Sequence, residues 1–325
     1  MALISWRPDG FLIAIGAVVA AAALFPQLGA RGGLLHIDVL TGFAIALVFF
    51  LHGAILPLEA LRRGVRNIRL HLVAQGVTFL LFPAIGTLIF ALGGGWFPSS
   101  IALGFFFMST VSSTISSSVA LTAVAGGDVA GALFNATLSG ILGVLVTPAY
   151  ASLMAHSIGV ALSLPEVIHS VAVKILLPLI LGQLFRPTLW KFLERHRAGV
   201  QLADRSSIIL IVYGAFCESV ATGVWNRAAA LPAVISVVVA AAALVLVSLV
   251  LVTLTRALRM DRASAIAAYF CGSQKSLANG LPTAHAIFAG SPAIGLIVMP
   301  LLVYHQLQLA AGAVIARRLG QRITA

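Results

Sequence analysis

The stretch Cys271-Gly272-Ser273-Gln274-Lys275-Ser276-Leu277-Ala278-Asn279-Gly280 interrupts an otherwise apolar part of the chain. A second stretch, Ser112-Ser113-Thr114-Ile115-Ser116-Ser117-Ser118, interrupts another apolar part closer to the N-terminus. These are the two least hydrophobic windows inside any apolar run of the sequence. We therefore treat them as the features that decide both the fold and the position of a binding site.

The composition excludes an ordinary soluble domain. Of the 325 residues, 60% are hydrophobic and only 9% are charged, whereas soluble domains carry about 25% charged residues. The net charge of +11 would indicate a nucleic-acid partner in a soluble protein. Here the basic residues instead follow the apolar runs. We therefore expect the protein to lie in a lipid bilayer and to bind no nucleic acid.

Apolar runs long enough to cross a bilayer need about 20 residues, and breaks at polar residues, Gly and Pro separate ten of them. No period-two alternation typical of barrel strands is present. The sequence thus predicts an all-α polytopic membrane protein with ten transmembrane helices. Their expected ranges are 11–27, 35–57, 70–92, 98–124, 128–155, 166–186, 205–223, 229–256, 262–289 and 291–316.

The positions of Lys and Arg predict the orientation of these helices. Most of the 20 basic residues lie near the N-terminus or follow the second, sixth, eighth and tenth spans, whereas Arg31 and Arg227 lie on the opposite side. We expect an integral protein of the plasma (inner) membrane with both termini in the cytoplasm.

Five spans in each half predict two inverted repeats, 11–155 and 166–316, within a single transporter unit of residues 1–325. An odd number of spans makes the second half enter the membrane from the opposite face. The two polar stretches then occupy equivalent places, in helices 4 and 9. Paired interruptions of this kind indicate discontinuous helices around the binding site of a secondary transporter, although small polar residues in the fourth span alone are also typical of tight helix packing.

Broken helices bring partly charged ends to mid-membrane, where carbonyls at C-terminal ends bind cations and N–H groups at N-terminal ends bind anions. We therefore predict a central site for a small organic anion. Its expected members are Ser113, Thr114, Ser116, Ser117, Ser118, Gln274, Lys275, Ser276 and Asn279.

Lys275 is the most informative of these residues, because a lysine at bilayer depth costs about 2.5–3.5 kcal/mol on insertion scales. No Asp or Glu lies in either stretch. We consider two roles for its ammonium: it replaces a coupling sodium ion, or it carries a proton. The coupling ion is accordingly absent, a proton, or a single sodium ion bound with Gln274, and we expect no other cofactor or metal.

Two further charges, Lys174 and Glu218, lie within spans six and seven. Opposite charges inside a membrane often pair, and the alternative is that both line the outer mouth of a substrate crevice. The histidines, among them His52 and His285, are scattered rather than spaced as metal ligands.

Three motifs resemble those of a known family: Gly127-Asp128-Val129-Ala130, Thr147-Pro148-Ala149 and the stretch Cys271–Ala278. They make nearly the whole chain similar to the sodium/bile-acid symporter superfamily, in particular its bile-acid-symporter-like branch, which includes solute carrier family 10 member 7. The resemblance implies crossed, discontinuous helices 4 and 9 and alternating access. It also implies panel helices (11–57 and 166–223) that move against core helices (70–155 and 229–316).

The chain departs from sodium-coupled members of the superfamily at several positions. Those members carry a Glu and an Asn where this chain has Phe270 and Lys275, and their sodium-binding Ser and Thr align with Ala132 and Ala136. Gln274 matches a sodium-ligand glutamine, and Gln75 is a second candidate. The resemblance therefore implies the fold and a transport role but does not support bile acid as the substrate.

Two alternatives come from other functional classes. Serine–lysine chemistry between the fourth-span serines and Lys275 would make an intramembrane hydrolase, although the chain has neither a GxSxG nor an HExxH motif. The other is a membrane regulator that moves no solute. Within the transporter class, a sodium-coupled bile-acid-type symporter also stays open. We expect a monomer or a weak dimer.

Overall fold

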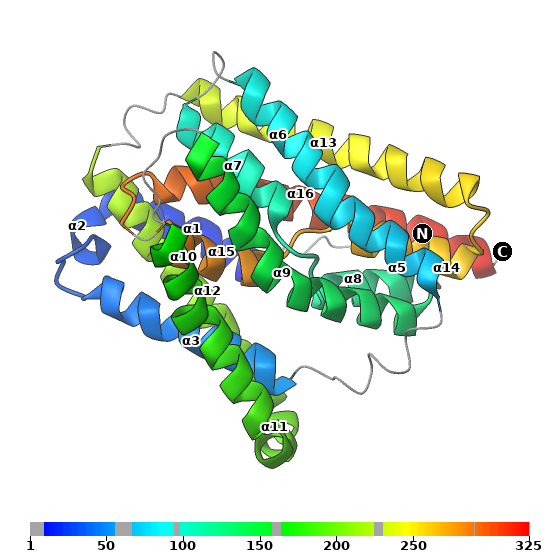
Figure 1. Cartoon of the computed structure of the whole chain (residues 1–325), viewed down its shortest axis with the longest axis horizontal. Coiled ribbons are helices and arrows are strands. Elements are labelled where there is room, and N and C mark those ends of the chain that lie inside the picture. The colour runs from blue at the N-terminus through cyan, green and yellow to red at the C-terminus, as the bar shows by residue number, and fades with distance from the viewer. Residues whose placement is uncertain are drawn as a thin grey trace.

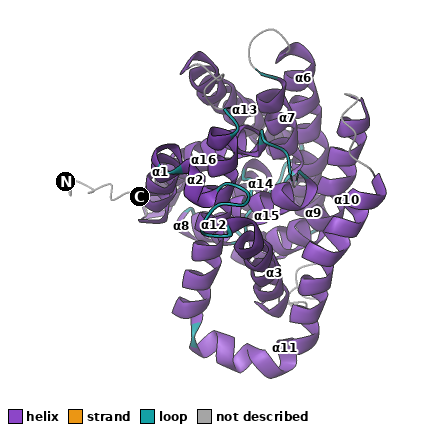
Figure 2. Ribbon diagram, turned by 90° about the vertical axis from the view of Figure 1, so that its left-hand side faces the viewer, coloured by secondary structure: helices purple, strands orange, loops and turns teal. Residues whose placement is uncertain are grey.

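The structure is a computed structural model that describes residues 10–55, 67–93, 98–157, 164–223, 230–288 and 290–324. Within these ranges all regular structure is helical (Figure 2). The basic residues Arg7, Arg62, Arg63, Arg66 and Arg227, and most of the expected boundary between the halves, lie outside the described residues.

The helices of the first half begin near the N-terminus and end before the expected boundary at residue 165. They are α1 (Gly10–Leu24), α2 (Pro26–Gly29), α3 (Ile37–Ile55), α5 (Ile68–Gly76), the π-helical turn η1 (Val77–Leu81), α6 (Phe82–Leu92), α7 (Ser99–Thr110), α8 (Ser116–Val124) and α9 (Val129–Ser157). The second half contains α10 (Leu164–Val171), the π-helical turn η3 (Ala172–Leu176), α11 (Leu177–Arg195), α12 (Arg197–Ala221), α13 (Ala230–Ala257), α14 (Arg262–Ser273), α15 (Leu277–Ile287) and α16 (Ile294–Thr324).

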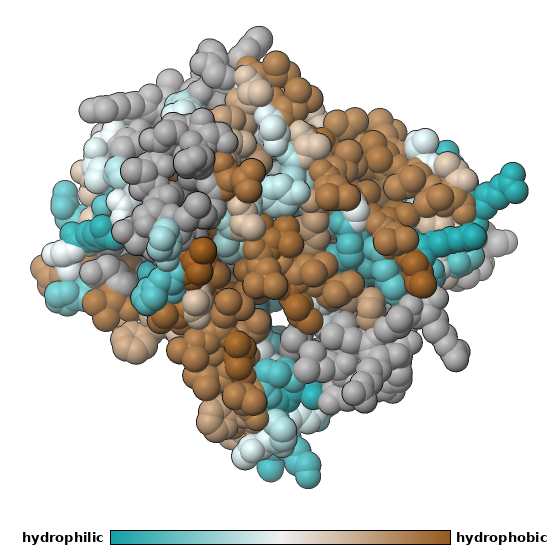
Figure 3. Space-filling view, viewed as in Figure 1, coloured by the Kyte–Doolittle hydropathy of each residue, from teal (hydrophilic) through white to brown (hydrophobic). Residues whose placement is uncertain are grey.

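Six of the described helical segments are long and apolar enough to cross a membrane. They are Ile68–Leu92, Val129–Ala151, Ile168–Arg195, Arg197–Ala221, Val234–Ala257 and Ile294–Gln321. The other predicted spans coincide with shorter apolar helices or with pairs of half-helices. Large apolar side chains such as Leu72, Leu184 and Leu249 are exposed, and apolar residues cover much of the face drawn in Figure 3. A surface of this kind is suited to lipid rather than to water.

The helices α11 and α12 extend beyond the predicted spans six and seven. The sequence predicts a long connection between residues 186 and 205, but only His196 separates the two helices. An exposed ion pair between Arg197 Nη2 and Glu194 Oε1, 2.7 Å apart, bridges this corner, which projects from the rest of the molecule (Figures 1 and 2). Hydropathy marks where a helix leaves the apolar layer and not where it begins or ends. The sequence analysis therefore placed the end of α11 too early and the start of α12 too late.

The helices expected to form the panel gather on one side of the molecule (Figure 1): α3 packs against α11 and α12, and α1 packs against α12. The contact between α3 and α11 depends on two glycines. A Cβ at Gly53 would collide with Leu179 O, and a Cβ at Gly182 would collide with Phe50 O. Small residues let two backbones approach closely, which is how helices associate tightly in membranes.

The helices expected to form the core surround the two polar stretches. The helix α7 lies against α6 and α16, α8 against α9, α14 and α16, and α13 against α14 and α16. Contacts between the two sets of helices run mainly from α12 to α15 and α16. Of the interrupted helices, α15 therefore lies where the two sets meet.

The α3–α11 contact yields a stability prediction with a matched control on the same helix. We expect Gly53→Ala to lower the free energy of unfolding by about 1–3 kcal/mol, because overpacked sites cannot relax freely. The control is Gly42→Ala, where a Cβ meets nothing within 4 Å and helix propensity improves by up to about 1 kcal/mol. Thermal unfolding in detergent micelles measures both, and equal melting temperatures for the two variants would contradict the close packing.

Candidate functional site

Both helices are interrupted where the sequence predicts. The helix α7 ends at Thr110 before α8 begins at Ser116, and α14 ends at Ser273 before α15 begins at Leu277. Val111 and Gln274, which follow the first half-helices, have extended backbone with ψ angles of 144° and 145°. The two breaks contact each other directly, because Ser276 N donates a hydrogen bond to Ser112 O at 2.8 Å.

The Lys275 ammonium lies among backbone carbonyls at the end of α7. Its Nζ donates to Ser109 O at 2.7 Å, to Val111 O at 2.8 Å and to Thr78 O at 3.0 Å. The side chain is fully buried, and Nζ lies 4.1 Å from the centre of the Phe82 ring. Three carbonyls match the three N–H groups of an ammonium, and the C-terminal end of a helix carries partial negative charge. The three carbonyls are ligands of the kind that bind cations, and the Lys275 side chain contacts all three.

The π-helical turn η1 explains why Thr78 O is free to accept this bond. Phe82 N donates to Val77 O, five residues earlier. In the same register the partner of Thr78 O would be the N–H of Pro83, which a proline lacks. A proline next to a π-turn thus leaves a carbonyl unpaired, and Lys275 satisfies it.

The helix α16 supports the second break from the opposite side. Gln308 Oε1 accepts from Lys275 N at 2.7 Å, and Gln308 Nε2 donates to Lys275 O at 2.8 Å. The Tyr304 hydroxyl donates to Ser273 O at 2.7 Å, and His305 Nδ1 lies 3.2 Å from Lys275 O. Unwound backbone at membrane depth must find partners within the protein, and these side chains provide them.

The buried serines of the first break mainly hold the two breaks together. Ser113 N donates to Ser139 Oγ at 2.9 Å, and Ser118 Oγ donates to Phe270 O at 3.2 Å. The hydroxyls of Ser113 and Ser118 are 3.4 Å apart. These two predicted site residues therefore lie where the breaks of the two interrupted helices contact each other, which we call the crossing. Much of their hydrogen-bonding capacity is already used there.

Ser117, Thr114 and Ser116 are more accessible. Ser117 donates to Gln274 Oε1, and its Oγ lies 3.3 Å from Thr114 Oγ1. Gln274 Nε2 is buried without a hydrogen-bond partner among the described residues. Ser116 is exposed on the surface and is not brought into the group. A buried amide N–H without an acceptor is available to an anionic or carbonyl group.

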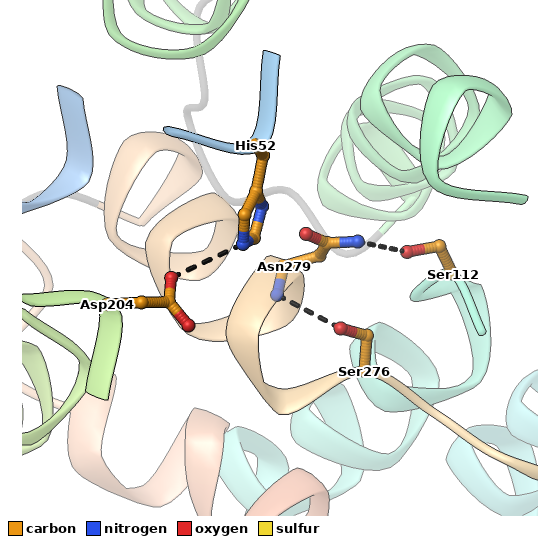
Figure 4. Close-up of polar contacts among 5 residues, drawn as sticks. All are labelled: His52, Ser112, Asp204, Ser276 and Asn279. Atoms are coloured by element: carbon orange, nitrogen blue, oxygen red, sulfur yellow. Dashed lines mark hydrogen bonds and ion pairs between the residues drawn. The ribbon is translucent and has the colours of Figure 1, made fainter. Parts of the chain in front are cut away.

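The start of α15 closes the crossing on the side that faces α3 (Figure 4). Ser276 Oγ caps α15 by accepting from Asn279 N at 3.1 Å, and Asn279 Nδ2 donates to Ser112 Oγ at 2.9 Å. Asn279 and Ser112 line a small pocket of about 10 Å³ together with Phe49 of α3. The pocket lies between the two sets of helices, next to the broken backbone.

A pair of titratable residues appears in the same view (Figure 4): His52 Nε2 of α3 lies 3.3 Å from Asp204 Oδ1 of α12. The ring of His52 also contacts Phe49 edge-on, with ring centres 6.2 Å apart. Nothing in the sequence joins residues so far apart in the chain, and His52 was expected to be one of the scattered histidines.

The secondary candidates lie outside the crossing. Gln75 Nε2 donates to Asn135 O at 2.9 Å, away from the contacts of Lys275. Lys174 and Glu218 form no ion pair with each other among the described residues, and Glu218 Oε2 instead accepts from Arg31 N at 2.9 Å. Both line a second, larger pocket, which is the arrangement expected from the alternative that places them at a crevice mouth.

Several residues that contact the breaks were missed from the sequence. Tyr304, His305 and Gln308 share one side of α16, and Ser139 of α9 is a polar residue inside an apolar run. Helical spacing of polar residues in spans five and ten is the signal that would have indicated them. The carbonyls of Ser109 and Val111 have no such signal, because every residue carries a carbonyl.

Comparison with known proteins gives a consistent assignment. The model of the SBF-like CPA transporter family matches residues 9–321. A protein of Escherichia coli (strain K12) named as symporter YfeH is 38% identical over 315 residues, covering 95% of this chain and 92% of that protein. Protein PA2026 of Pseudomonas aeruginosa is 35% identical, covering 97% and 94% of the two chains. Sodium/bile acid cotransporter 7 of Xenopus tropicalis is 30% identical, covering 95% and 91%. These names indicate an integral membrane transporter and not an enzyme.

The clamp of Gln308 on the unwound backbone predicts a stability effect. We expect Gln308→Ala to lower the free energy of unfolding by about 1–3 kcal/mol, because Lys275 N is left without an acceptor and Lys275 O keeps only the contact with His305 Nδ1. The matched control is Gln306→Ala on the same helix, because Gln306 has no hydrogen bond in the described part of the chain and is only half-buried. Melting temperatures in micelles compare the two, and a Gln308→Ala variant as stable as Gln306→Ala would show that the clamp is dispensable.

Proposed function

We propose a transport function from the premise that this chain belongs to the SBF-like CPA transporter family. The protein is proposed to be a secondary active transporter of small organic anions. In it, the Lys275 ammonium takes the place of one coupling sodium ion. The observation that carries this proposal is the carbonyl cage around Lys275 Nζ. In discontinuous-helix transporters, unwound carbonyls and C-terminal half-helix ends coordinate the coupling cation. An ammonium on the same kind of ligands supplies the same charge without leaving the protein.

The number of acceptors favours a fixed charge over a proton carrier. A neutral amine has two N–H groups and one lone pair, so loss of the proton would leave one of the three carbonyls facing a lone pair. A buried carbonyl without a donor is costly. Transport by this protein then needs one coupling cation fewer than a carrier whose cage is empty.

The side chains around the cage also support replacement of sodium. Phe270, Ala132 and Ala136 are fully buried, and they stand where the resemblance implies a carboxylate and two hydroxyls in sodium-coupled members. An apolar ring and two methyl groups provide no ligands for a hard cation. A remaining sodium ion would depend on Gln274.

The anion half of the proposal depends on donors near the crossing. Gln274 Nε2 is a buried donor without a partner among the described residues, and Asn279 lines the adjacent pocket. Fixed donors in a water-poor site orient an anionic group. We place the anionic end of the substrate here, at the boundary between panel and core helices.

Alternating access is proposed as rocking of the panel helices against the core helices, with the ten spans arranged as two inverted repeats. The packing of α12 against α15 and α16 supplies the surface on which such a movement would occur.

We further propose an inner-membrane location with both termini in the cytoplasm, on the distribution of Lys and Arg.

The role of Lys275 is tested by removing its ammonium so that a free cation can bind the three carbonyls. We expect Lys275→Asn, the residue implied for sodium-coupled members, to lower the melting temperature in KCl and to recover part of the loss in NaCl at equal ionic strength. Sodium at 100 times its Kd would restore about 2.7 kcal/mol. The gain in melting temperature from KCl to NaCl should be larger in Lys275→Asn than in the wild type. The control Lys174→Asn, which changes another intramembrane lysine, should show the same gain as the wild type.

A second variant keeps the test decisive if Lys275→Asn is poorly folded. Lys275→Ala leaves a space beside the Phe82 ring and the three carbonyls, and methylammonium should stabilise this variant more than tetramethylammonium, which has no N–H donor. Substrate uptake that requires sodium in the wild type and is unchanged in Lys275→Ala would disprove the proposal.

A further inference from the structure

A second pocket lies between panel and core helices, near the C-terminal end of α15. Its volume is about 140 Å³, compared with about 10 Å³ for the pocket at the crossing. Its charged and titratable lining residues are Arg31, Lys174, Glu218 and His285. We infer that this pocket is a vestibule that binds an amphipathic organic anion before the anion reaches the crossing; the inference rests on the proposed transport function and adds to it a second site and a substrate class.

The balance of charge in this pocket favours an anion. Two cationic side chains, Arg31 and Lys174, line it with one carboxylate, Glu218. The carboxylate already accepts a hydrogen bond from Arg31 N at 2.9 Å. Neither the Arg31 guanidinium nor the Lys174 ammonium has an ion-pair partner in the described part of the chain. Unpaired cations in a membrane protein carry a desolvation penalty, which a bound carboxylate, sulfonate or phosphate group would reduce.

A buried donor or acceptor without a partner points into the same region. His285 Nδ1 is buried and has no hydrogen bond among the described residues. His285, Lys174 and Arg31 line the same pocket, although they come from α15, η3 and the segment after α2. Lys174 lies in the π-helical turn η3, and π-turns occur frequently at functional sites.

The helix α15 connects the two pockets. Asn279 and Thr283 of this helix line the pocket at the crossing, and His285 lines the vestibule. One helix therefore contributes residues to both pockets. In this arrangement the vestibule selects for charge, and the crossing completes recognition.

The apolar part of the lining defines the rest of the substrate. Ile37, Ile45 and Ile294 line the pocket together with the basic residues, and a mostly apolar lining with a few polar groups is typical of small-molecule sites. We expect a ligand with one anionic group next to Lys174 and Arg31 and an apolar body against the isoleucines. A small polyanion such as citrate would leave the apolar wall unused.

The charge of the vestibule is measured with a cysteine at Gly42. Gly42 lines the pocket, and a Cβ there meets nothing within 4 Å, so Gly42→Cys introduces a thiol without displacing a neighbour. The native Cys217 and Cys271 are buried, and the parent protein corrects for their labelling. Rates of modification are compared in nanodiscs for a sulfonate-bearing and a trimethylammonium-bearing methanethiosulfonate. We expect the anionic reagent to react about tenfold faster, as electrostatic focusing allows.

Changes in charge identify the source of this preference. The rate ratio should fall toward one in Gly42→Cys proteins that also carry Lys174→Gln or Arg31→Gln, and it should rise with Glu218→Gln. The control is Lys191→Gln, which removes an exposed lysine outside the pocket and should leave the ratio unchanged. A ratio near one in Gly42→Cys alone, or an equal effect of Lys191→Gln, would overturn the vestibule.

Binding is measured with defined probes in the same variant. Naphthalene-2-sulfonate should slow labelling of the Gly42→Cys thiol by neutral N-ethylmaleimide, whereas naphthalene-2-sulfonamide and citrate should not. Equal protection by the sulfonate and the sulfonamide would refute an anion site. The labelling rates depend on neither turnover nor Lys275. The vestibule can therefore be disproved while Lys275→Asn responds to sodium as proposed. Conversely, the role of Lys275 can be disproved while the labelling rates support the vestibule.

Discussion

The contact between the Lys275 ammonium and the free carbonyls of Ser109, Val111 and Thr78 is the constraint on which the rest of the structure depends. A helix that ends inside a membrane leaves carbonyls unpaired, and each unpaired group is costly in a medium without water. A lysine at the same depth is also costly. Each feature satisfies the other, so the lysine lowers the cost of the break in α7 and the break lowers the cost of the buried lysine.

The all-helical fold and the residues at which helices 4 and 9 are interrupted were predictable from the sequence, because Gly, Ser and a charged residue are unfavourable in a continuous apolar helix. The cage itself was not, since backbone carbonyls carry no sequence signature and Thr78 O is free only because Pro83 lacks an N–H. The exposed position of Ser116 was missed for a related reason: periodicity identifies a polar stretch but not which of its members face the neighbouring helix. The extent of α11 and α12 was underestimated because hydropathy does not report helical structure outside the apolar layer.

The two pockets along α15 suggest a division of roles within one transporter. At the crossing, most polar groups bind one another, and few are left for a ligand beyond Gln274 Nε2 and the amide of Asn279. In the vestibule, by contrast, the cationic side chains lack ion-pair partners among the described residues. In the proposed division, the hydrogen-bonded crossing would hold the broken helices in place, and the unpaired charges of the vestibule would attract an anionic substrate.

The central claim is that Lys275 is a permanently charged stand-in for a mobile cation, and the protonation state of Nζ tests it most directly. Nitrogen-15 NMR of protein labelled only at lysine is suited to this, because the chain has just Lys174, Lys191 and Lys275, and a Lys275→Met sample assigns the signal. The account predicts the chemical shift of an ammonium at Lys275 from about pH 6 to about pH 9, unaffected by sodium, as the three-carbonyl cage requires. The shift of a neutral amine within that range would contradict it.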